Sequence, residues 1–247
     1  MKYKRFVFMV LLLLTPLIIG NVKAFAMTTG FSTEPLPQDK VNVCLDNINL
    51  SFVSEEPLKW PIECFDVNKN RLIAIGQDTP NRKTICIYSN EGVFQYGYTF
   101  NCSGSFGIEW DEENLNIYFV RSNIIVSVTP NGEILNVCEV QNTSENNSYI
   151  NHFIHATKRT IGETDYVIKN NKNNMNIFDI FASSYSQLIT VDSSGKQSTV
   201  YNADSAQLAE ITTIFVAALI FISIFISIAF AVLRMLIMRF VNARHKN

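Results

Sequence analysis

The sequence lacks an excess of charge of either sign: 20 Lys and Arg stand against 22 Asp and Glu, with 3 His. Without a basic stripe or an acidic block, we expect neither a nucleic-acid partner nor a solvating tail. The chain also lacks a nucleophile elbow, a phosphate-binding Gly-rich loop and a dinucleotide fingerprint. These absences weigh against an enzyme, and they predict no catalytic residue, no cofactor and no metal site.

Cysteine is sparse and forms no paired motif. Because no C-x-x-C occurs, we expect neither a redox motif nor a structural zinc site. In an oxidising compartment, five cysteines allow one or two disulfides and leave at least one thiol over. Cysteines inside apolar runs can equally be free and buried. The pairing stays open for Cys44, Cys64, Cys86, Cys102 and Cys138.

Charge is absent altogether from Ile211–Leu233. As a helix this run would reach roughly 35 Å, which exceeds the hydrocarbon core of about 30 Å. Acidic residues precede it, whereas Arg234, Arg239, Arg244 and Lys246 follow it, so the positive-inside rule places the C-terminus in the cytoplasm. We expect a transmembrane helix over residues 209–238 and a short basic cytoplasmic tail over 239–247.

The start of the chain predicts the same topology. Lys2, Lys4 and Arg5 precede the apolar run Phe6–Ile19, and Ala24-Phe25-Ala26 forms a small-x-small cleavage site. We expect residues 1–26 to be a cleaved signal peptide, and an uncleaved signal anchor is the alternative. Both place the middle of the chain outside, so we expect a single-pass type I protein of the cell membrane.

The segment between these two runs consists of short β-rich stretches between turn clusters. Residues 27–40 contain Pro35 and Pro37 and predict a linker or arm. Val41–Val53 alternates in places between polar and apolar residues, as a half-buried strand does. From Ile62 the apolar runs become regular and span four to eight residues, which is typical of antiparallel meander sheets. We therefore predict an extracytoplasmic all-β domain over residues 41–208.

Two stretches of this domain can be laid over one another, and a third copy follows over Tyr166–Tyr201. The third copy has candidate strands at Tyr166–Ile168, Ile177–Ala182, Leu188–Val191 and Ser198–Tyr201. In each of the first two copies an Asp closes a strand and opens a turn, where its carboxylate can cap N–H groups. A Gly in each copy supplies the positive φ that a tight hairpin needs. The expected turn-structural residues are Asp66, Gly92, Asp111, Gly132 and Gly195.

The repeat resembles a β-propeller blade of the NHL or WD40-like kind, a four-stranded meander of about forty residues. The resemblance rests on the hydrophobic-x-hydrophobic-turn-Gly corners at Ile85–Gly92 and Val126–Gly132, covers Ile62–Tyr201, and lacks a Gly-His…Trp-Asp signature. Three blades, or four if Val41–Lys59 contributes, are fewer than most rings contain. The expected fold class is therefore all-β: repeated four-stranded antiparallel meander sheets in a partial β-propeller arrangement, plus one C-terminal transmembrane helix. A ring completed by a second copy and a stacked sandwich are the alternatives.

Two polar clusters of the domain contain residue types that can bind a metal. His152 and His155 lie in the polar insertion Gln141–Thr164 and could share a helix face, but a metal needs a third ligand. Asp111-Glu112-Glu113 is an acidic turn, whereas calcium needs six or more oxygens from converging segments. We expect solvated histidines and a structural turn.

The apolar run carries a stripe of small residues. Ser223, Ser227 and Ala231 recur every four residues and share one helix face, which permits close packing against a second helix. Small residues tolerated by chance are the alternative. The stripe predicts association with a protein partner or formation of a homo-oligomer through this helix.

Taken together, the sequence predicts a membrane-anchored extracytoplasmic binding or scaffolding module, or an accessory subunit of a membrane complex. Exposed turns on a rigid sheet scaffold are where such contacts usually lie. The alternative from another class is an anchored hydrolase with a metal site at a propeller mouth.

Overall fold

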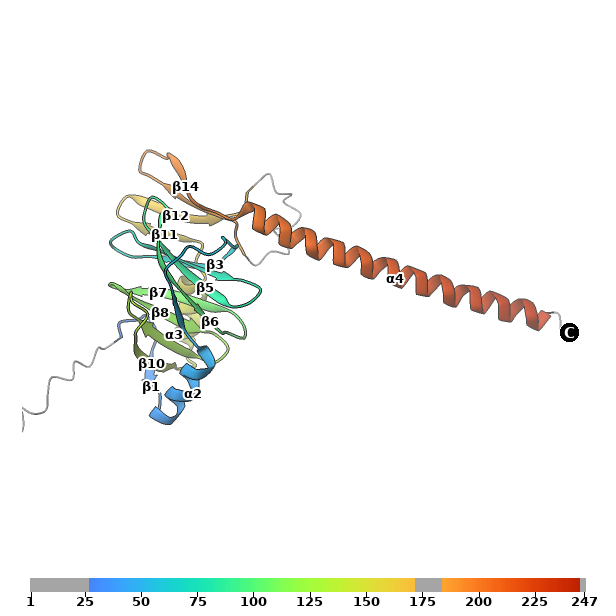
Figure 1. Cartoon of the computed structure of the whole chain (residues 1–247), viewed down its shortest axis with the longest axis horizontal. Helices are drawn as coiled ribbons and strands as arrows, with labels where there is room; N and C mark the ends of the chain where they lie inside the picture. The colour runs from blue at the N-terminus through green and yellow to red at the C-terminus, as the bar shows by residue number, and fades with distance from the viewer. Residues whose placement is uncertain (1–26, 172–183, 245–247) are drawn as a thin grey trace, which may run out of the picture.

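The computed structural model describes residues 27–171 and 184–244. The expected signal peptide (1–26) and the expected strand Ile177–Ala182 lie outside these residues. Three antiparallel sheets form the N-terminal domain, and one long helix leaves it at the C-terminal end (Figure 1). The chain is therefore mostly β with one apolar helix, as the sequence predicts.

The middle sheet forms from the first regular β-rich stretch. Its strands, in spatial order, are β2 (Ser51–Val53), β6 (Phe94–Phe100), β5 (Lys83–Tyr88), β4 (Ile73–Asp78) and β3 (Ile62–Val67). The β5–β6 turn contains Gly92 at φ 79°, and its N–H donates to the Ser89 carbonyl at 3.0 Å. Glycine adopts this positive φ without a steric cost, so the two strands can pair directly.

The second sheet repeats this order of strands. It contains β1 (Thr33–Pro35), β10 (Ile134–Val140), β9 (Ile124–Val128), β8 (Asn114–Phe119) and β7 (Phe106–Asp111). Gly132 lies in the β9–β10 turn at φ 83° and donates to the Thr129 carbonyl at 2.9 Å. The sheet is thus a meander of four consecutive strands, with β1 added at its edge.

The third sheet contains β11 (Lys158–Ile161), β12 (Thr164–Lys169), β13 (Gln187–Val191) and β14 (Gln197–Asn202). Its last turn contains Gly195 at φ 81°. Strand β11 lies inside the expected polar insertion Gln141–Thr164, which also forms α3 (Ser144–Tyr149) and the π-helical turn η1 (Ile150–Ile154). Three of the four residues of β11 are polar, so the sequence does not show the apolar pattern by which the other strands are recognised.

The middle sheet is buried on both faces. Ala74, Ile85 and Ile87 pack toward the second sheet, whereas Ile73 and Ile75 pack toward the third. Successive side chains of a strand point to opposite faces of the sheet. Strands that are apolar at consecutive positions therefore place apolar side chains in the cores on both faces of the middle sheet. Figure 1 shows the sheet of β3–β6 between the other two. Among the described residues no strand pairing joins the second sheet to the third, so no closed ring is seen.

The expected strand over Val41–Val53 is wrong for most of its length. Residues Gln38–Ile48 form helix α2, and only Ser51–Val53 form a strand. Val41, Cys44, Leu45 and Ile48 recur at helical spacing and pack against the core between the middle and second sheets. Residues 27–40, expected as a linker or arm, contain β1 and the buried Phe31, so the folded domain begins before residue 41.

Helix α4 (Asp204–Arg244) is long and apolar enough to span a membrane: a stretch of 18 residues within Asp204–Met235 has a mean hydropathy of 2.9. Its first turn is fixed to the β domain. The side chain of Gln207 is buried and donates to the Asn170 side chain at 2.8 Å and to the Ser184 carbonyl at 3.2 Å. The apolar side chains over residues 214–235 are exposed, which suits contact with lipid.

Candidate functional site

An open cleft of about 1050 Å³ lies between α2 and the ends of the middle and second sheets. Four segments that are far apart in the sequence line it: α2, the β4–β5 turn, the β6–β7 link and the β8–β9 turn. We call it the α2 cleft. Its lining includes Leu36, Asp39, Lys40, Val43, Cys44, Ile48, Asp78, Arg82, Lys83, Cys102, Phe119 and Arg121.

Helix α2 is held at the cleft by hydrogen bonds at its C-terminal end. Asn49 ends the helix in the left-handed conformation at φ 46°, and its N–H donates to the Leu45 carbonyl. The backbone N–H of Asn101 donates to the Ile48 carbonyl at 2.7 Å. The guanidinium of Arg82 donates to the carbonyl of Asn49. These bonds satisfy carbonyls that a helix end leaves unpaired, and they join α2 to the middle sheet.

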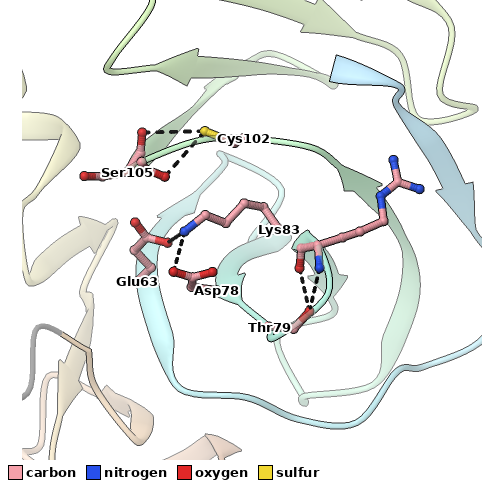
Figure 2. Close-up of polar contacts among 8 residues, drawn as sticks. Glu63, Asp78, Thr79, Lys83, Cys102 and Ser105 are labelled. Carbon is pink, nitrogen blue, oxygen red and sulfur yellow. Dashed lines mark hydrogen bonds and ion pairs between the residues drawn. The ribbon is translucent and has the colours of Figure 1, made fainter. Parts of the chain in front are cut away.

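Lys83 forms the charged floor of the α2 cleft. Its ammonium lies 2.5 Å from a carboxylate oxygen of Asp78 and 3.2 Å from one of Glu63 (Figure 2). Thr79 orders the same turn, because its hydroxyl donates to the Arg82 carbonyl at 2.5 Å. Two carboxylates on neighbouring segments therefore surround one buried lysine.

Burial would lower the pKa of Lys83, but the contacts with Asp78 and Glu63 outweigh burial and raise it. Burial raises the pKa of Glu63, although Lys83 acts in the opposite direction. A lysine with a raised pKa stays protonated at neutral pH and is not an amine nucleophile. Lys83 therefore acts as a fixed positive charge.

The other charges of the α2 cleft are mostly positive. Lys40 and Arg121 are exposed on its lining, and Arg82 is half-buried. Outside the ion pairs of Lys83, Asp39 is the acidic residue of the lining. A concave surface with this balance attracts an acidic group, and Val43 and Leu36 add apolar area beside it.

A second charged cluster lies where β3, β7 and β11 meet, and we call it the central ion pair. Nε of Arg159 lies 2.7 Å from Oδ1 of Asp66, and both side chains are buried. The other oxygen of Asp66 accepts from the backbone N–H of Trp110 at 2.8 Å. Asp66, expected to cap its own turn, thus bonds across to two other sheets, and Asn68 caps that turn through the Leu72 N–H at 2.8 Å.

Glu109 lies beside the central ion pair on β7. Its carboxylate accepts from the Tyr149 hydroxyl at 2.6 Å, the Thr29 hydroxyl at 2.5 Å and the Gly30 N–H at 3.0 Å. Burial raises the pKa of this carboxyl, while these donors act in the opposite direction. Glu109 thus joins the N-terminal segment and α3 to the second sheet.

The structure places the remaining expected turn residues at the ends of strands. Gly92, Gly132 and Gly195 each adopt a positive φ in a hairpin turn. Asp111 ends β7, and its carboxylate accepts from the Thr28 N–H at 2.8 Å. The structure does not bring these residues together at one site.

The candidate metal ligands do not converge. His152 and His155 are both exposed, and His152 Nδ1 lies 2.8 Å from the Ser148 carbonyl. No group of three or more His, Cys, Asp or Glu side chains suited to a metal occurs in the part of the chain that the structure describes.

The small residues Ser223, Ser227 and Ala231 lie on α4. The Ser223 hydroxyl donates to the Ile220 carbonyl and the Ser227 hydroxyl to the Ser223 carbonyl, both at 2.8 Å. Both hydroxyls are therefore satisfied within the helix, so any contact with a second helix would depend on the small size of these residues.

Sequence reasoning missed α2, Arg82, Lys83 and Arg121 as parts of one site. The helical spacing of Val41, Cys44, Leu45 and Ile48 is a signal that could have revealed α2. No sequence signal connects the turns, because their meeting depends on how the sheets stack. No protein-family model, curated protein or solved structure matches the chain.

Proposed function

We propose that this chain is a membrane-anchored extracytoplasmic binding module, an accessory subunit that holds an acidic segment of a membrane protein in the α2 cleft. The observation that carries the proposal is the positive charge of this cleft on a domain that continues directly into the membrane helix. Fixed charge gives a binding surface both its orientation and its choice of partner.

The cleft opens at the edge of the domain from which α4 leaves. Strand β14 ends at Asn202, which pairs with Gln187 at the start of β13. Tyr185, just before, bridges to Ile62, and Ile62 pairs with Gln77 at the end of β4. The β4–β5 turn therefore lies on the membrane side. A ligand there would lie near the bilayer, where a neighbouring membrane protein presents its own extracytoplasmic segments.

The proposal includes the topology expected from the sequence: a cleaved signal peptide, a single span, and a cytoplasmic tail over 239–247. A membrane-impermeant maleimide on intact cells tests it. A cysteine introduced at Ser193, in an exposed turn, should be labelled without lysis, whereas a cysteine introduced in the tail should be labelled only after lysis. The reverse pattern would contradict an extracytoplasmic domain.

We infer further that the three sheets are copies of one unit similar to a propeller blade. The support is that each sheet contains four consecutive antiparallel strands and a Gly turn before the last strand. In this arrangement the α2 cleft belongs to the ends of two neighbouring units, and α2 covers them from outside.

Site-specific photocrosslinking tests the proposed binding function. Val43 lines the cleft and is 62% exposed, whereas Val93 is 59% exposed on the β5–β6 turn at the opposite edge. A benzophenone side chain at position 43, in the full chain in its native membranes, should give one discrete adduct with a membrane protein. The same group at position 93 is the matched control and should not give it.

Charge reversal sharpens this experiment. Lys40→Glu with Arg121→Glu should abolish the adduct at position 43, because both changes repel an acidic segment. Arg71→Glu, an exposed change in the β3–β4 turn at the opposite edge, should leave it intact. Equal adducts from positions 43 and 93, or an adduct that survives the double reversal, would overturn the proposal.

A further inference from the structure

Three of the five cysteines lie in three separate cores. Cys64 faces the core between the middle and second sheets, and Cys86 faces the core on the other side of the middle sheet. Cys138 belongs to the core between the second sheet, α3 and η1. Side chains on opposite faces of a sheet cannot meet, so these three cysteines have no bonding partner among themselves.

Cys44 and Cys102, in contrast, share the α2 cleft. Both line it, both are half-buried, and both pack at the edge of one core. Asn101, next to Cys102, donates from its backbone to the Ile48 carbonyl at 2.7 Å. Ile48 lies one helical turn after Cys44 and on the same face of α2. The chain that carries Cys102 is therefore tied to α2 one turn away from Cys44.

A disulfide needs the two Cα atoms within about 7 Å, and one helical turn rises about 5.4 Å. Little holds the Cys102 side chain away from α2. Its thiol contacts the carbonyl oxygens of Gly104 at 3.5 Å and Ser105 at 3.9 Å, the second drawn in Figure 2, and both are weak contacts for a thiol donor. Both thiols are free in the structure, so a bond between them requires the Cys102 side chain to rotate and the first turns of α2 to shift.

Cys64 is the competing partner, because it belongs to the same core as the half-buried pair. It is 2% exposed and lies against Gly76 and Phe106: a Cβ added to Gly76 would lie 2.5 Å from its sulfur. Exchange requires an oxidant to reach the attacking thiolate. Access therefore favours the two cysteines of the cleft.

We propose that Cys44 and Cys102 form a disulfide that fastens α2 across the cleft, which makes this binding surface a site of oxidative modification. The proposal rests on the extracytoplasmic location proposed above, because disulfides persist in oxidising compartments.

The oxidant is a disulfide donor, either glutathione disulfide or an oxidised dithiol oxidoreductase. One cysteine thiolate attacks the donor to give a mixed disulfide and a donor thiol. The second thiolate then displaces the other donor sulfur. Cys44 and Cys102 lose two electrons and two protons, and the donor gains both.

The test uses the purified full-length chain in detergent, equilibrated with defined mixtures of oxidised and reduced glutathione. After an acid quench, alkylation and digestion, mass spectrometry should find a peptide that links Cys44 to Cys102. The linked peptide should disappear in excess reduced glutathione. Cys64, Cys86 and Cys138 should be alkylated only after denaturation.

Two serine variants complete the experiment. Cys102→Ser should lose the linked peptide completely, and Cys138→Ser, a change in a separate core, should keep it. Absence of the 44–102 peptide in the oxidising mixture, or a link from Cys102 to Cys64, would overturn the pairing.

This assay is independent of topology and of any ligand, so it can fail while the crosslinking at position 43 succeeds. The same digestion on protein taken from native membranes tests the compartment. A bond that forms in glutathione but is missing in the cell would contradict the extracytoplasmic location and leave the pairing intact.

Discussion

Two buried cations, Arg159 and Lys83, are both neutralised by carboxylates, but their surroundings differ. In the central ion pair the side chains of Arg159 and Asp66 are 8% and 6% exposed, and the guanidinium lies 4.2 Å from the centre of the Phe153 ring. Lys83 is 7% exposed, whereas the side chain of its partner Asp78 is 62% exposed. One cluster is enclosed on every side, and the other opens into the α2 cleft.

This difference separates a structural role from the binding role that we propose for the α2 cleft. Arg159 also donates to the Phe153 carbonyl at 2.7 Å, so it joins β11, β3 and η1, and its donors point at protein atoms. The side chain of Asp78 is mostly exposed, so another acidic group can take its place beside Lys83 while Glu63 stays in contact. A buried charge with one exchangeable partner suits recognition, whereas a fully enclosed pair holds elements together.

The largest effect is expected from Arg159→Met. It leaves Asp66 buried without its counter-ion, so the free energy of unfolding should fall by about 3–5 kcal/mol. Chemical denaturation of the full chain in detergent, followed by near-UV circular dichroism, measures this loss. Arg71→Met, an exposed change, is the control and should have almost no effect. A loss below about 1 kcal/mol for Arg159→Met would show that the pair is dispensable.

Lys83→Met should cost less, about 1–3 kcal/mol, because the carboxylates left behind can be solvated or protonated. Asp78→Asn should cost at most about 1 kcal/mol, since this partner is mostly exposed. The same denaturation assay ranks the three variants. If Lys83→Met destabilised the domain as much as Arg159→Met, the contrast between the two clusters would be lost.

The pH dependence of the unfolding free energy tests whether burial beside the central ion pair raises the pKa of Glu109. Its raised pKa means that the folded chain binds more protons than the unfolded chain between the ordinary value of about 4.5 and the raised value. Its contribution is therefore present in acid and is lost as the pH rises through that window. Glu109→Gln should flatten this part of the profile of unfolding free energy against pH. An unchanged slope would mean that folding does not raise the pKa of Glu109.

The rates at which the thiols react should distinguish the cysteines of the α2 cleft from the enclosed cysteines, as exposure distinguishes the two charged clusters. Burial raises the pKa of Cys44 and of Cys102, so their alkylation in the reduced, folded chain should be slow at neutral pH and accelerate well beyond pH 9. Burial raises the pKa of Cys86 to about 12, and this enclosed thiol should react only on unfolding. Alkylation rates resolved by peptide mass spectrometry would show the difference, and labelling of Cys86 at the rate of Cys44 would contradict it.

The smallest effect is expected from Ser223→Leu with Ser227→Leu in α4. If these small residues face a second helix, the bulkier side chains should weaken association by about 1 kcal/mol. A membrane two-hybrid assay measures the association. The stability of both charged clusters should not change, because α4 beyond its first turn lies outside the β domain. An unchanged association signal would remove the stripe as a contact.

Much of the architecture could be predicted because it depends on local pattern. The β-rich runs and the Gly turns mark most strands, since alternation and positive φ are properties of short segments. Helix α2 was missed because its apolar residues also alternate in part, and β11 was missed because most of its side chains are polar or exposed. Asp66 was expected in its own turn, and its bond to Arg159 spans 93 residues of sequence.

The sequence by itself determined that this protein is mostly β and that it carries one helix apolar enough for a membrane. Both properties follow from residue patterns within a few turns or strands. Only the tertiary structure decided that α2, two turns and a link form one positive cleft, and that Cys44 and Cys102 share it. Contacts between segments of different sheets depend on which sheet faces are buried against each other. The apolar side chains of the middle sheet do not specify which sheet packs on which of its two faces.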